Sequence, residues 1–478
     1  MITLDTFYID GGWVAPNGQM TMPIMNPASA SQVGTLTLGS AEDVDRAVAA
    51  AKRAFETFSL TSKEERLALL ENLRRETKAR LKDLAEAMTL EMGAPASMSL
   101  DVQAHSGLAH LEDFIKALTS LNDEETLPNG DIISREPIGV CGLITPWNWP
   151  INQIAQKVVP ALATGATCVL KPSEHTPLSA QIYAEIVDAA GYPKGVFNLV
   201  QGDGPTVGAA MARHPDVDMM SFTGSTRAGT MVSKDAADTI KRITLELGGK
   251  SPNLVFADAN LQACVAASVA ECFYNTGQSC NAPTRLLVER SCYADVLELA
   301  KEAAEQQAVA DPALAGEHIG PVFDKIQFDR VQSMIQIGID EGAKLLIGGL
   351  GKPEGLEQGW YVKPTIFYDV DHDMQISREE IFGPVLVITA FDSEAEAITL
   401  ANDSQYGLAA YIQSNDEARV ARVARRLRAG TIQINGRGPD YGSPFGGYKQ
   451  SGNGREGGIF GLEDYLEIKV RPPFMASV

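Results

Sequence analysis

The sequence is poor in basic side chains and contains no long hydrophobic run. Its 478 residues include 40 Lys and Arg against 61 Asp and Glu, which gives a net charge of −21. A nucleic-acid surface needs clustered Lys and Arg, so we expect no nucleic-acid partner. The most apolar run covers residues 158–170 and contains both proline and glycine. It is too short to cross a bilayer, so we also expect no membrane partner.

The six cysteines are scattered along the chain and form no CxxC pair or Cys/His spacing typical of metal ligands. We therefore expect no metal site and no disulfide framework. Residues 1–11 contain two aspartates and lack the basic-then-apolar pattern of a signal peptide. These features predict a cytoplasmic protein in a reducing compartment, in which most cysteines are small buried hydrophobic residues.

The hydrophobic pattern predicts an α/β fold. Short strands and turns are expected before residue 41, and helices from there to about residue 118. One of these helices is expected to run from a capping box at residues 61–64 to about residue 92. Apolar strands then alternate with helices, which is typical of a parallel sheet. The four clearest strands cover residues 139–144, 167–171, 196–200 and 219–222.

A second alternating region runs from residue 253 to about residue 430. Its clearest helices are expected over residues 300–310 and 327–342. The segment 121–140 between the two regions contains the turn residues Pro128-Asn129-Gly130. It predicts an extended arm or strand pair, and an ordinary hairpin is an equal alternative.

One stretch combines a cysteine with small and polar neighbours, Gly277-Gln278-Ser279-Cys280-Asn281. Its thiol is a candidate nucleophile if the local charge favours the thiolate. Glu246 precedes it by enough chain to turn back towards it, and could serve as a general base. Alone, a single cysteine is more often structural, and such a carboxylate is more often a turn or ion-pair residue.

Other candidates lie at the ends of the predicted strands. Asn148 stands between two tryptophans and two prolines, where its amide could donate to an oxyanion or simply belong to a packing turn. Lys171 and Glu174 follow a strand, where α/β sheets bind ligands, or form a surface charge pair. Ser225 begins a helix after Gly224 and is suited to phosphate binding or plain helix capping.

Taken in order, these stretches resemble motifs of the aldehyde dehydrogenase superfamily. Residues 146–150 match its PWNxP motif, 171–174 its KPSE turn, 222–226 its FTGST turn, 379–385 its EEIFGPV motif and 444–452 its PFGGYKxSG loop. The matches extend from about residue 26 to residue 456. The resemblance implies an α/β fold with a Rossmann-type cofactor domain, an α/β catalytic domain and a β oligomerisation arm.

The resemblance also implies domain boundaries and a quaternary structure. The NAD-binding domain would comprise residues 1–120 and 138–248, the catalytic domain 249–448, and the arm 121–137 and 460–478. Such an arm leaves an exposed strand edge in a monomer, so a homodimer or homotetramer is expected.

By the same resemblance Cys280 is the nucleophile, Asn148 the oxyanion donor, Glu246 the base that activates water, and Lys157 a proton-relay residue. A solvated or structural lysine is the alternative for Lys157. The implied cofactor contacts are Ile144, Thr145, Trp147, Lys171, Ser173, Glu174, Gly204, Gly224, Ser225, Leu247, Gly248, Glu380 and Phe382. Gly204 belongs to a GxGxxxG run that is weak as a signal of its own. Glu174 would repel a 2′-phosphate, which favours NAD and leaves NADP possible.

The implied reaction is oxidation of an aldehyde to a carboxylic acid with NAD(P) through a cysteine thiohemiacetal and thioester. Three alternatives fit the residues less well. A CoA-acylating enzyme would not need Glu246, and a cofactor-independent cysteine thioesterase or esterase would leave Lys171, Glu174 and Glu380 unexplained. A silent binding protein should have lost a catalytic residue. The expected substrate tunnel is polar, which predicts a substrate with a hydroxyl, carboxylate or other polar group. Its lining is expected to include Gln153, Gln156, Tyr274, Ser279, Asn281 and Tyr441.

Overall fold

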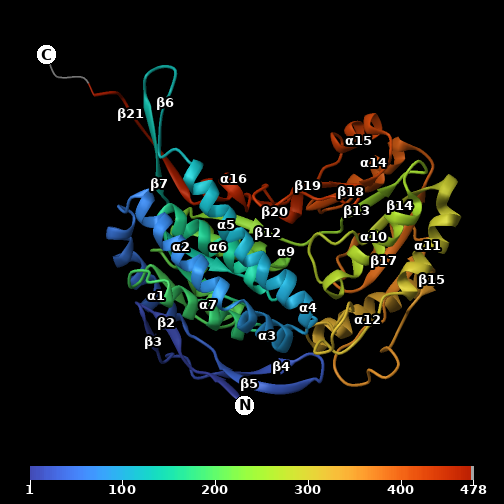
Figure 1. Cartoon of the computed structure of the whole chain (residues 1–478), viewed down its shortest axis with the longest axis horizontal. Helices are drawn as coiled ribbons and strands as arrows, with labels where there is room; N and C mark the ends of the chain where they lie inside the picture. Colours follow the sequence, from blue (N-terminus) through green and yellow to red (C-terminus); the bar gives the residue numbers. More distant parts are fainter. Residues whose placement is uncertain (475–478) are drawn as a thin grey trace.

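The computed structural model describes residues 1–474, and within them two large sheets form the centres of two lobes (Figure 1). The first is an eight-stranded sheet of the described residues with the order β20-β12-β11-β8-β9-β10-β2-β3. The five strands from β12 to β10 run parallel, with antiparallel strands at both edges. Their bounds are β2 Phe7–Ile9, β3 Gly12–Val14, β8 Val140–Ile144, β9 Thr167–Lys171, β10 Phe197–Leu199, β11 Met219–Thr223, β12 Arg242–Glu246 and β20 Gly452–Asn453.

Helices cover this sheet, and three of its central strands are buried along their whole length. Such burial on both faces is the reason these strands are continuous apolar runs rather than alternating patterns. The helices are α1 Ala41–Phe58, α2 Lys63–Ala79, α3 Leu81–Met92, α4 Ala96–Met98, α5 His105–Ser120, α6 Pro150–Thr164, α7 Pro177–Ala189, α8 Ala209–Arg213, α9 Thr226–Ala236 and α16 Gly458–Glu463. A π-helical segment, Ser99–Ala104, leads into α5.

The capping box predicted over residues 61–64 lies one residue later, at Ser62 and Glu65, and the single helix predicted to follow it is wrong. The Ser62 hydroxyl accepts from the Glu65 backbone N–H, and the Glu65 carboxylate accepts from the Ser62 N–H. The helix ends at Arg80, whose φ of −108° and ψ of 10° leave the α region, and α3 then starts in a new direction. A single change of backbone conformation at a residue with good helix propensity is not visible in a periodic pattern.

The second lobe contains a seven-stranded sheet with the order β15-β16-β17-β14-β13-β18-β19, counted within residues 1–474. Six strands are parallel, and β15 is antiparallel at one edge. The strands are β13 Pro252–Val255, β14 Arg285–Glu289, β15 Lys344–Ile347, β16 Thr365–Tyr368, β17 Val385–Phe391, β18 Ala409–Gln413 and β19 Thr431–Ile434. The helices are α10 Leu261–Phe273, α11 Tyr293–Glu305, α12 Lys325–Asp340, α13 Gln375–Arg378, α14 Glu394–Asn402 and α15 Glu417–Ala424.

The helix predicted over residues 300–310 lies earlier than expected. It is α11, whose buried face includes Val296, Ala300 and Ala304, and the chain leaves the helix after Glu305. Val309 instead forms a β-bridge with Ile319. Long-range pairing therefore overrides the local helical pattern at the end of this segment.

Residues 121–140 form strands, as predicted, and lie in a sheet that projects from the first lobe (Figure 1). β6 Glu124–Thr126 and β7 Ile132–Pro137 form a hairpin, and β21 Leu466–Arg471 pairs with the other side of β7. Ile468 and Val470 on β21 are more than half exposed. At the opposite side of the lobe, β1 Ile2–Leu4, β5 Ser31–Thr37 and β4 Thr21–Asn26 form a small sheet.

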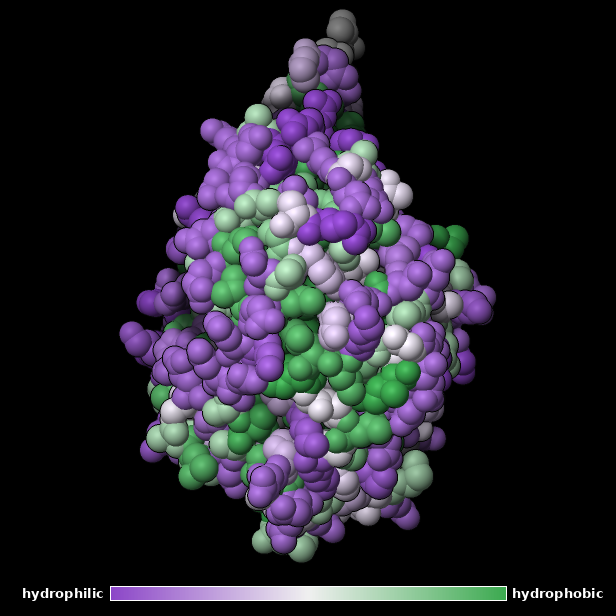
Figure 2. All heavy atoms as spheres, turned by 90° about the vertical axis from the view of Figure 1, so that its right-hand side faces the viewer, coloured by the Kyte–Doolittle hydropathy of each residue, from purple (hydrophilic) through white to green (hydrophobic). Residues whose placement is uncertain are grey.

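The surface is mainly hydrophilic on the side that lies at the right of Figure 1. Figure 2 shows that side, with polar residues around its margins and hydrophobic residues gathered in a narrow central band. Within the described part of the chain, no helix is both long enough and apolar enough to cross a membrane.

Candidate active site

The loop that carries Cys280 begins with a strained backbone. After α10 the chain passes through Asn275, Thr276 and Gly277 with φ values of 52°, 57° and 71°. A β-branched threonine rarely adopts this conformation, which persists only where surrounding contacts fix it. The Thr276 hydroxyl donates to the Gly320 carbonyl at 3.1 Å, and the Asn275 amide donates to the backbone oxygens of Asn148 and Gln278. These bonds hold the cysteine loop against two other segments of the chain.

The glycines after Glu246 allow its loop to lie directly against the cysteine loop. A Cβ placed on Gly249 would lie 2.4 Å from the Cys280 carbonyl oxygen, and one on Gly277 would lie 2.2 Å from the Gly383 oxygen. Only residues without a side chain permit such approaches. The segments around Glu246, Cys280 and Gly383, far apart in the sequence, therefore meet at one point between the lobes.

Asn148 lies in the loop between β8 and α6, and its amide faces the cysteine loop. Its side-chain nitrogen donates to the Gln278 carbonyl at 3.0 Å, which uses one of its two hydrogens. The neighbouring Trp149 indole donates to the Ser279 hydroxyl at 3.0 Å. These two bonds to the residues just before Cys280 fix the orientation of the Asn148 loop, and the second amide hydrogen remains for another acceptor.

Glu246 ends β12 with both carboxylate oxygens buried and without a hydrogen-bond partner among the described residues. Burial raises the pKa of Glu246 well above its usual value, the charge of Glu456 adds to the rise, and Lys157 opposes it. A Cβ on Gly446 would lie 2.7 Å from a Glu246 oxygen, so the C-terminal glycine loop closes over the carboxylate. In this environment the neutral acid is favoured until the pH rises.

Lys157 does not reach the solvent, and it forms a buried ion pair. Its ammonium donates to Glu456 Oε1 at 2.6 Å and to the Ser221 hydroxyl at 2.9 Å, with no exposed side-chain surface. The alternative of a solvated lysine is therefore wrong. Glu456 borders the same cavity as Cys280, so the pair lies between the interior of the first lobe and the site.

The Cys280 thiol is partly buried and surrounded by acids. Burial raises the pKa of Cys280 well above its usual value, and the carboxylates of Glu380, Glu246 and Glu456 raise it further. The thiol is accordingly protonated at neutral pH in this environment. Reaction as a nucleophile needs a base that removes the proton, and Glu246 borders the same cleft.

Two cavities meet at Cys280. The first is a cleft of about 270 Å³ between the lobes, lined in part by Trp147, Asn148, Glu246 and Glu380. The second has a volume of about 460 Å³ and opens on the other side of the cysteine. Cys280, Trp149 and Gln153 border both. A thiol at such a junction can face one ligand from each side.

The first cleft gathers about half of the predicted cofactor contacts. They are Trp147, Gly224, Ser225, Leu247, Gly248, Glu380 and Phe382. Glu380 accepts from the Gly249 N–H at 3.0 Å, and burial raises the pKa of Glu380 to about 7. The flat ring of Trp147 stacks on Phe323 with centroids 3.7 Å apart and meets the edge of Phe382 at 5.5 Å.

The remaining predicted contacts do not line this cleft. They are Ile144, Thr145, Lys171, Ser173, Glu174 and Gly204. Lys171 and Glu174 form an ion pair at 2.8 Å beside the carboxyl end of β9. Gly204 starts a short π-helical segment capped by Asp203, and its Cα faces open space. These residues lie at or after the carboxyl ends of strands β8, β9 and β10.

The second cavity includes four of the six predicted tunnel residues, Gln153, Gln156, Asn281 and Tyr441. Tyr274 and Ser279 do not border it directly, although the Tyr274 ring lies 6.1 Å from that of Trp149 and Ser279 is bonded to the same tryptophan. The sequence did not predict His110, Asn152, Gln433 or Glu456 there. They come from helix α5, helix α6, strand β19 and the C-terminal loop, and none belongs to a recognisable motif.

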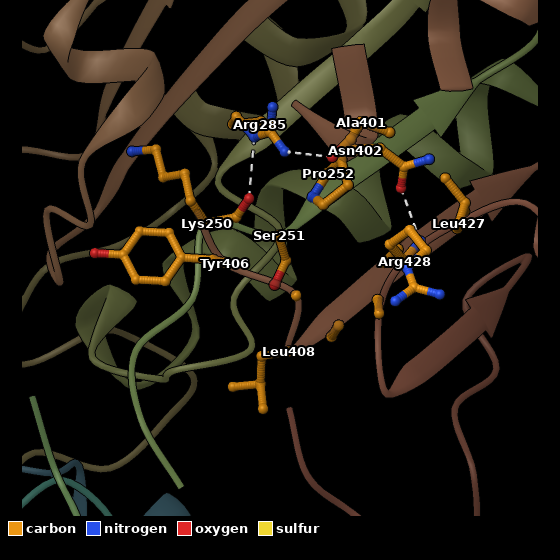
Figure 3. Close-up of a pocket in the computed structure, with 14 residues that line it drawn as sticks. Lys250, Ser251, Pro252, Arg285, Ala401, Asn402, Tyr406, Leu408, Leu427 and Arg428 are labelled. Atoms are coloured by element: carbon orange, nitrogen blue, oxygen red, sulfur yellow. Dashed lines mark hydrogen bonds between the residues drawn. The ribbon is translucent and has the colours of Figure 1, made fainter. Parts of the chain in front are cut away.

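Arg285, five residues after the nucleophile candidate, is a buried anchor (Figure 3). Its guanidinium donates to the carbonyls of Lys250, Leu400 and Ala401 at 3.0 Å each, which ties β14 to the segment after Glu246 and to α14. Figure 3 shows the Lys250 side chain pointing away from Ser251. The cavity beside them has about 10 Å³, room for about one water, so it supports the site rather than binding a substrate.

The model of the Aldehyde dehydrogenase family matches residues 13–471. This chain belongs to that family. It is 53% identical to 3-succinoylsemialdehyde-pyridine dehydrogenase from a Pseudomonas species over 97% of both chains. It is also similar to two solved aldehyde dehydrogenases, each with a TM-score of 0.97. The enzyme from Bartonella henselae is 49% identical and aligned over 98% of this chain and 99% of its own. A mutant of aldehyde dehydrogenase C from Pseudomonas syringae, solved with NAD⁺ and octanal, is 48% identical over 99% and 98%.

The family membership confirms the resemblance inferred from the motifs and the expected aldehyde dehydrogenase fold. As a member of the aldehyde dehydrogenase family, the chain is an enzyme of aldehyde oxidation. The position of Cys280, Glu246 and Asn148 around one junction then provides the geometry from which their individual roles are proposed.

Proposed function

We propose that this aldehyde dehydrogenase oxidises an aldehyde with NAD to a carboxylic acid through a covalent intermediate on Cys280. The observation that carries the proposal is the junction of two cavities at this thiol, with Glu246 and Asn148 beside it. The aldehyde enters from the larger cavity, and the cofactor occupies the cleft on the other side.

The cleft fits a dinucleotide in its chemistry. Ser225 caps the N-terminus of the eleven-residue helix α9, whose free backbone N–H groups favour a phosphate. The neighbouring Thr223 hydroxyl is buried without a partner among the described residues, and it borders the cleft. Trp147, Phe382 and Leu247 provide apolar walls for a flat ring. When bound, NAD supplies the acceptor for the hydride that leaves the aldehyde carbon.

The Lys171–Glu174 pair at the sheet edge supports NAD over NADP. Its carboxylate would accept from ribose hydroxyls and repel a 2′-phosphate, while Lys171 is neutralised by the pair itself. A solved relative, aldehyde dehydrogenase C from Pseudomonas syringae, contains NAD⁺ in its structure. NADP remains a second cofactor only if Glu174 turns away from the ribose.

Different residues of the chain then act at different steps of the reaction. Glu246 accepts the Cys280 proton, and the thiolate forms a C–S bond with the aldehyde carbon as the carbonyl π bond becomes an oxyanion. Glu246 then releases this proton to water in the cavity, which restores its carboxylate for hydrolysis. The free amide hydrogen of Asn148 and the Cys280 backbone N–H donate to the resulting oxyanion. Loss of hydride from the former aldehyde carbon leaves a thioester. Water attacks the thioester while Glu246 takes a proton from the water. Breaking of the C–S bond releases the carboxylate and the thiolate.

Lys157 and Glu456 support Glu246 as positioning residues. Burial and the charge of Glu456 raise the pKa of Glu246, and the ammonium of Lys157 opposes this rise and so favours the ionised form of the base. The glutamate in turn neutralises the buried lysine at 2.6 Å. This arrangement supports a role of the pair in setting the pKa of Glu246, whereas Glu246 itself acts at the reacting atoms.

The projecting sheet supports a homodimer or homotetramer. β21 is an edge strand with exposed Ile468 and Val470, and α16 nearby exposes Phe460. An unpaired apolar edge of this kind invites pairing with another strand. A second copy of the chain is the proposed partner, with β21 at the contact.

The test is nicotinamide reduction, followed by absorbance, with a panel of aldehydes and either NAD or NADP. The wild type should turn over with NAD, Cys280→Ala should be inactive, and Cys264→Ala should serve as the matched cysteine control. Glu246→Gln should slow the burst of reduced cofactor, because the thiol loses its base, and should stop turnover after one stoichiometric burst, because the thioester is no longer hydrolysed. No reduction with any aldehyde, together with cofactor-free thioester hydrolysis, would favour the thioesterase alternative instead.

A further inference from the structure

We infer that the substrate cavity selects a neutral aldehyde that carries a ring and a hydrogen-bonding group, and rejects an aldehyde that carries a carboxylate. The inference rests on the proposed aldehyde oxidation and names the substrate class of the same site. It follows from three independent properties of the lining, namely its unpaired polar atoms, its aromatic walls and its charges.

Three polar atoms in this lining have no hydrogen-bond partner among residues 1–474. They are the side-chain oxygens of Gln153, Gln156 and Thr431, each buried at the cavity wall. A buried polar atom without a partner is unfavourable, so a substrate group that bonds it is preferred over one that cannot. A site of this kind discriminates strongly against analogues that lack the bonding group.

Aromatic rings form two sides of the cavity. Trp149 forms one side, with the Tyr274 ring outside the lining at 6.1 Å from it, and His110 meets Tyr441 edge-on at 4.9 Å on another side. Phe445 also belongs to the lining. Rings at these distances accept a further ring in an offset or edge-to-face arrangement. A flat substrate is therefore favoured over a flexible alkyl chain of equal size.

The charges around the cavity are acidic. Glu456 and Asp440 border it, whereas no Lys or Arg of the described chain does. Two nearby cations are paired, Lys157 with Glu456 at 2.6 Å and Arg437 with Asp440 at 4.0 Å, and Arg455 donates to the backbone carbonyls of Gly447 and Gly454. Burial lowers the pKa of His110 to about 4, so this ring is neutral at physiological pH. A substrate carboxylate would be desolvated here without a free cation to pair with it.

The decisive comparison uses para-formylbenzamide and para-formylbenzoate, which have nearly the same shape and differ in charge. With NAD near neutral pH, kcat/KM for the amide should exceed that for the carboxylate by about tenfold or more. Equal values, or a preference for the carboxylate, would overturn the inference. Hexanal distinguishes failure of the substrate class from failure of the proposed function. If hexanal is turned over but para-formylbenzamide is not preferred over para-formylbenzoate, only the substrate class is rejected. If no aldehyde is turned over, the proposed function is rejected.

Two variants assign the preference to the lining. Gln156→Met removes the unpaired amide at similar volume and should lower kcat/KM for para-formylbenzamide by about tenfold relative to hexanal. Gln336→Met, on the outside of α12, is the matched control and should leave that ratio unchanged. An unchanged ratio in Gln156→Met would contradict the hydrogen-bonding part of the inference.

Asp440→Lys reverses one charge at the mouth of the cavity. The Asp440 side chain is 88% exposed, so the folding of the variant is not in question. It should raise the use of para-formylbenzoate relative to para-formylbenzamide by about fivefold, an effect that weakens with added salt because the charge is exposed. No change in this ratio at low salt would show that charge does not govern the selection.

Discussion

Replacement of Lys157 by methionine would test whether the buried pair controls the base. The side chain is fully buried, and its ammonium contacts Glu456 and Ser221. Methionine has a similar length and carries no charge. The variant therefore leaves two buried carboxylates, Glu456 and Glu246, without the Lys157 ammonium that is paired with Glu456 in the wild type.

The expected loss of stability follows from the burial of the pair. Removing one partner of a buried ion pair costs about 3–5 kcal/mol, because the other charge stays buried and uncompensated. We expect Lys157→Met to lower the free energy of unfolding by about 4 kcal/mol. Replacing both partners by apolar residues is often close to neutral. The double variant with Glu456→Leu should therefore lie within about 1 kcal/mol of the wild type.

The pH dependence provides a second signature. The pKa of Glu246 is raised in the folded state above its ordinary value of 4.5, so the folded protein retains this proton longer and stability falls as the pH rises past that value. Loss of Lys157 raises the pKa further, because its charge opposes the rise. The fall in stability should then extend to higher pH, and the rise of steady-state turnover with pH should shift in the same direction.

Denaturant unfolding at acidic, neutral and alkaline pH, combined with burst and steady-state kinetics, would measure both effects. Lys157→Met should retain a burst of reduced cofactor while its steady rate at neutral pH falls more, because Glu246 acts again in hydrolysis. A single variant as stable as the wild type would refute the magnitude derived from burial. An unshifted pH profile would refute the control of Glu246 by this pair, even in a destabilised protein.

Three further perturbations test other contacts. Glu174→Gln frees Lys171 from its 2.8 Å ion pair and removes the repelling charge, so kcat/KM with NADP should rise about tenfold; an unchanged NAD to NADP ratio would contradict this. Arg285→Met leaves three carbonyls without a donor and should lower the denaturant stability by about 3 kcal/mol, whereas a smaller loss would show that water replaces it. Ile468→Asp with Val470→Asp should shift the mass in light scattering to the monomer, and an unchanged mass would place the contact elsewhere.

The parallel strands were predictable because burial on both faces gives them continuous apolar sequences. The predicted strand 167–171 coincides with β9, and 219–222 differs from β11 by one residue. Helix ends were less predictable, because they depend on one residue or on a distant partner. Arg80 breaks a helix without any sequence signal, and Val309 leaves the helical pattern to pair with Ile319.

The site was predictable where a short motif carries the chemistry. Asn148, Glu246 and Cys280 each lie in a local sequence with an unusual composition, and the glycines near Glu246 and Cys280 reflect close approaches that only glycine permits. The lining of the substrate cavity was harder to predict from the sequence. His110 and Gln433 are single polar residues on ordinary elements, and only the fold turns them towards Cys280.

Glu456 shows why the remainder could not be read from the sequence. It lies 299 residues after Lys157, and its neighbours are the glycines and arginine of a surface-like loop. Its importance comes from being buried beside a lysine and a second glutamate, which is a property of three distant segments at once. A pKa depends on the charges within a few ångströms, so the tuning of a base belongs to the packed structure even when the base itself is visible in a motif. Substrate choice follows the same logic, because the charge of a cavity is the sum over walls that the chain contributes from separate helices, strands and loops.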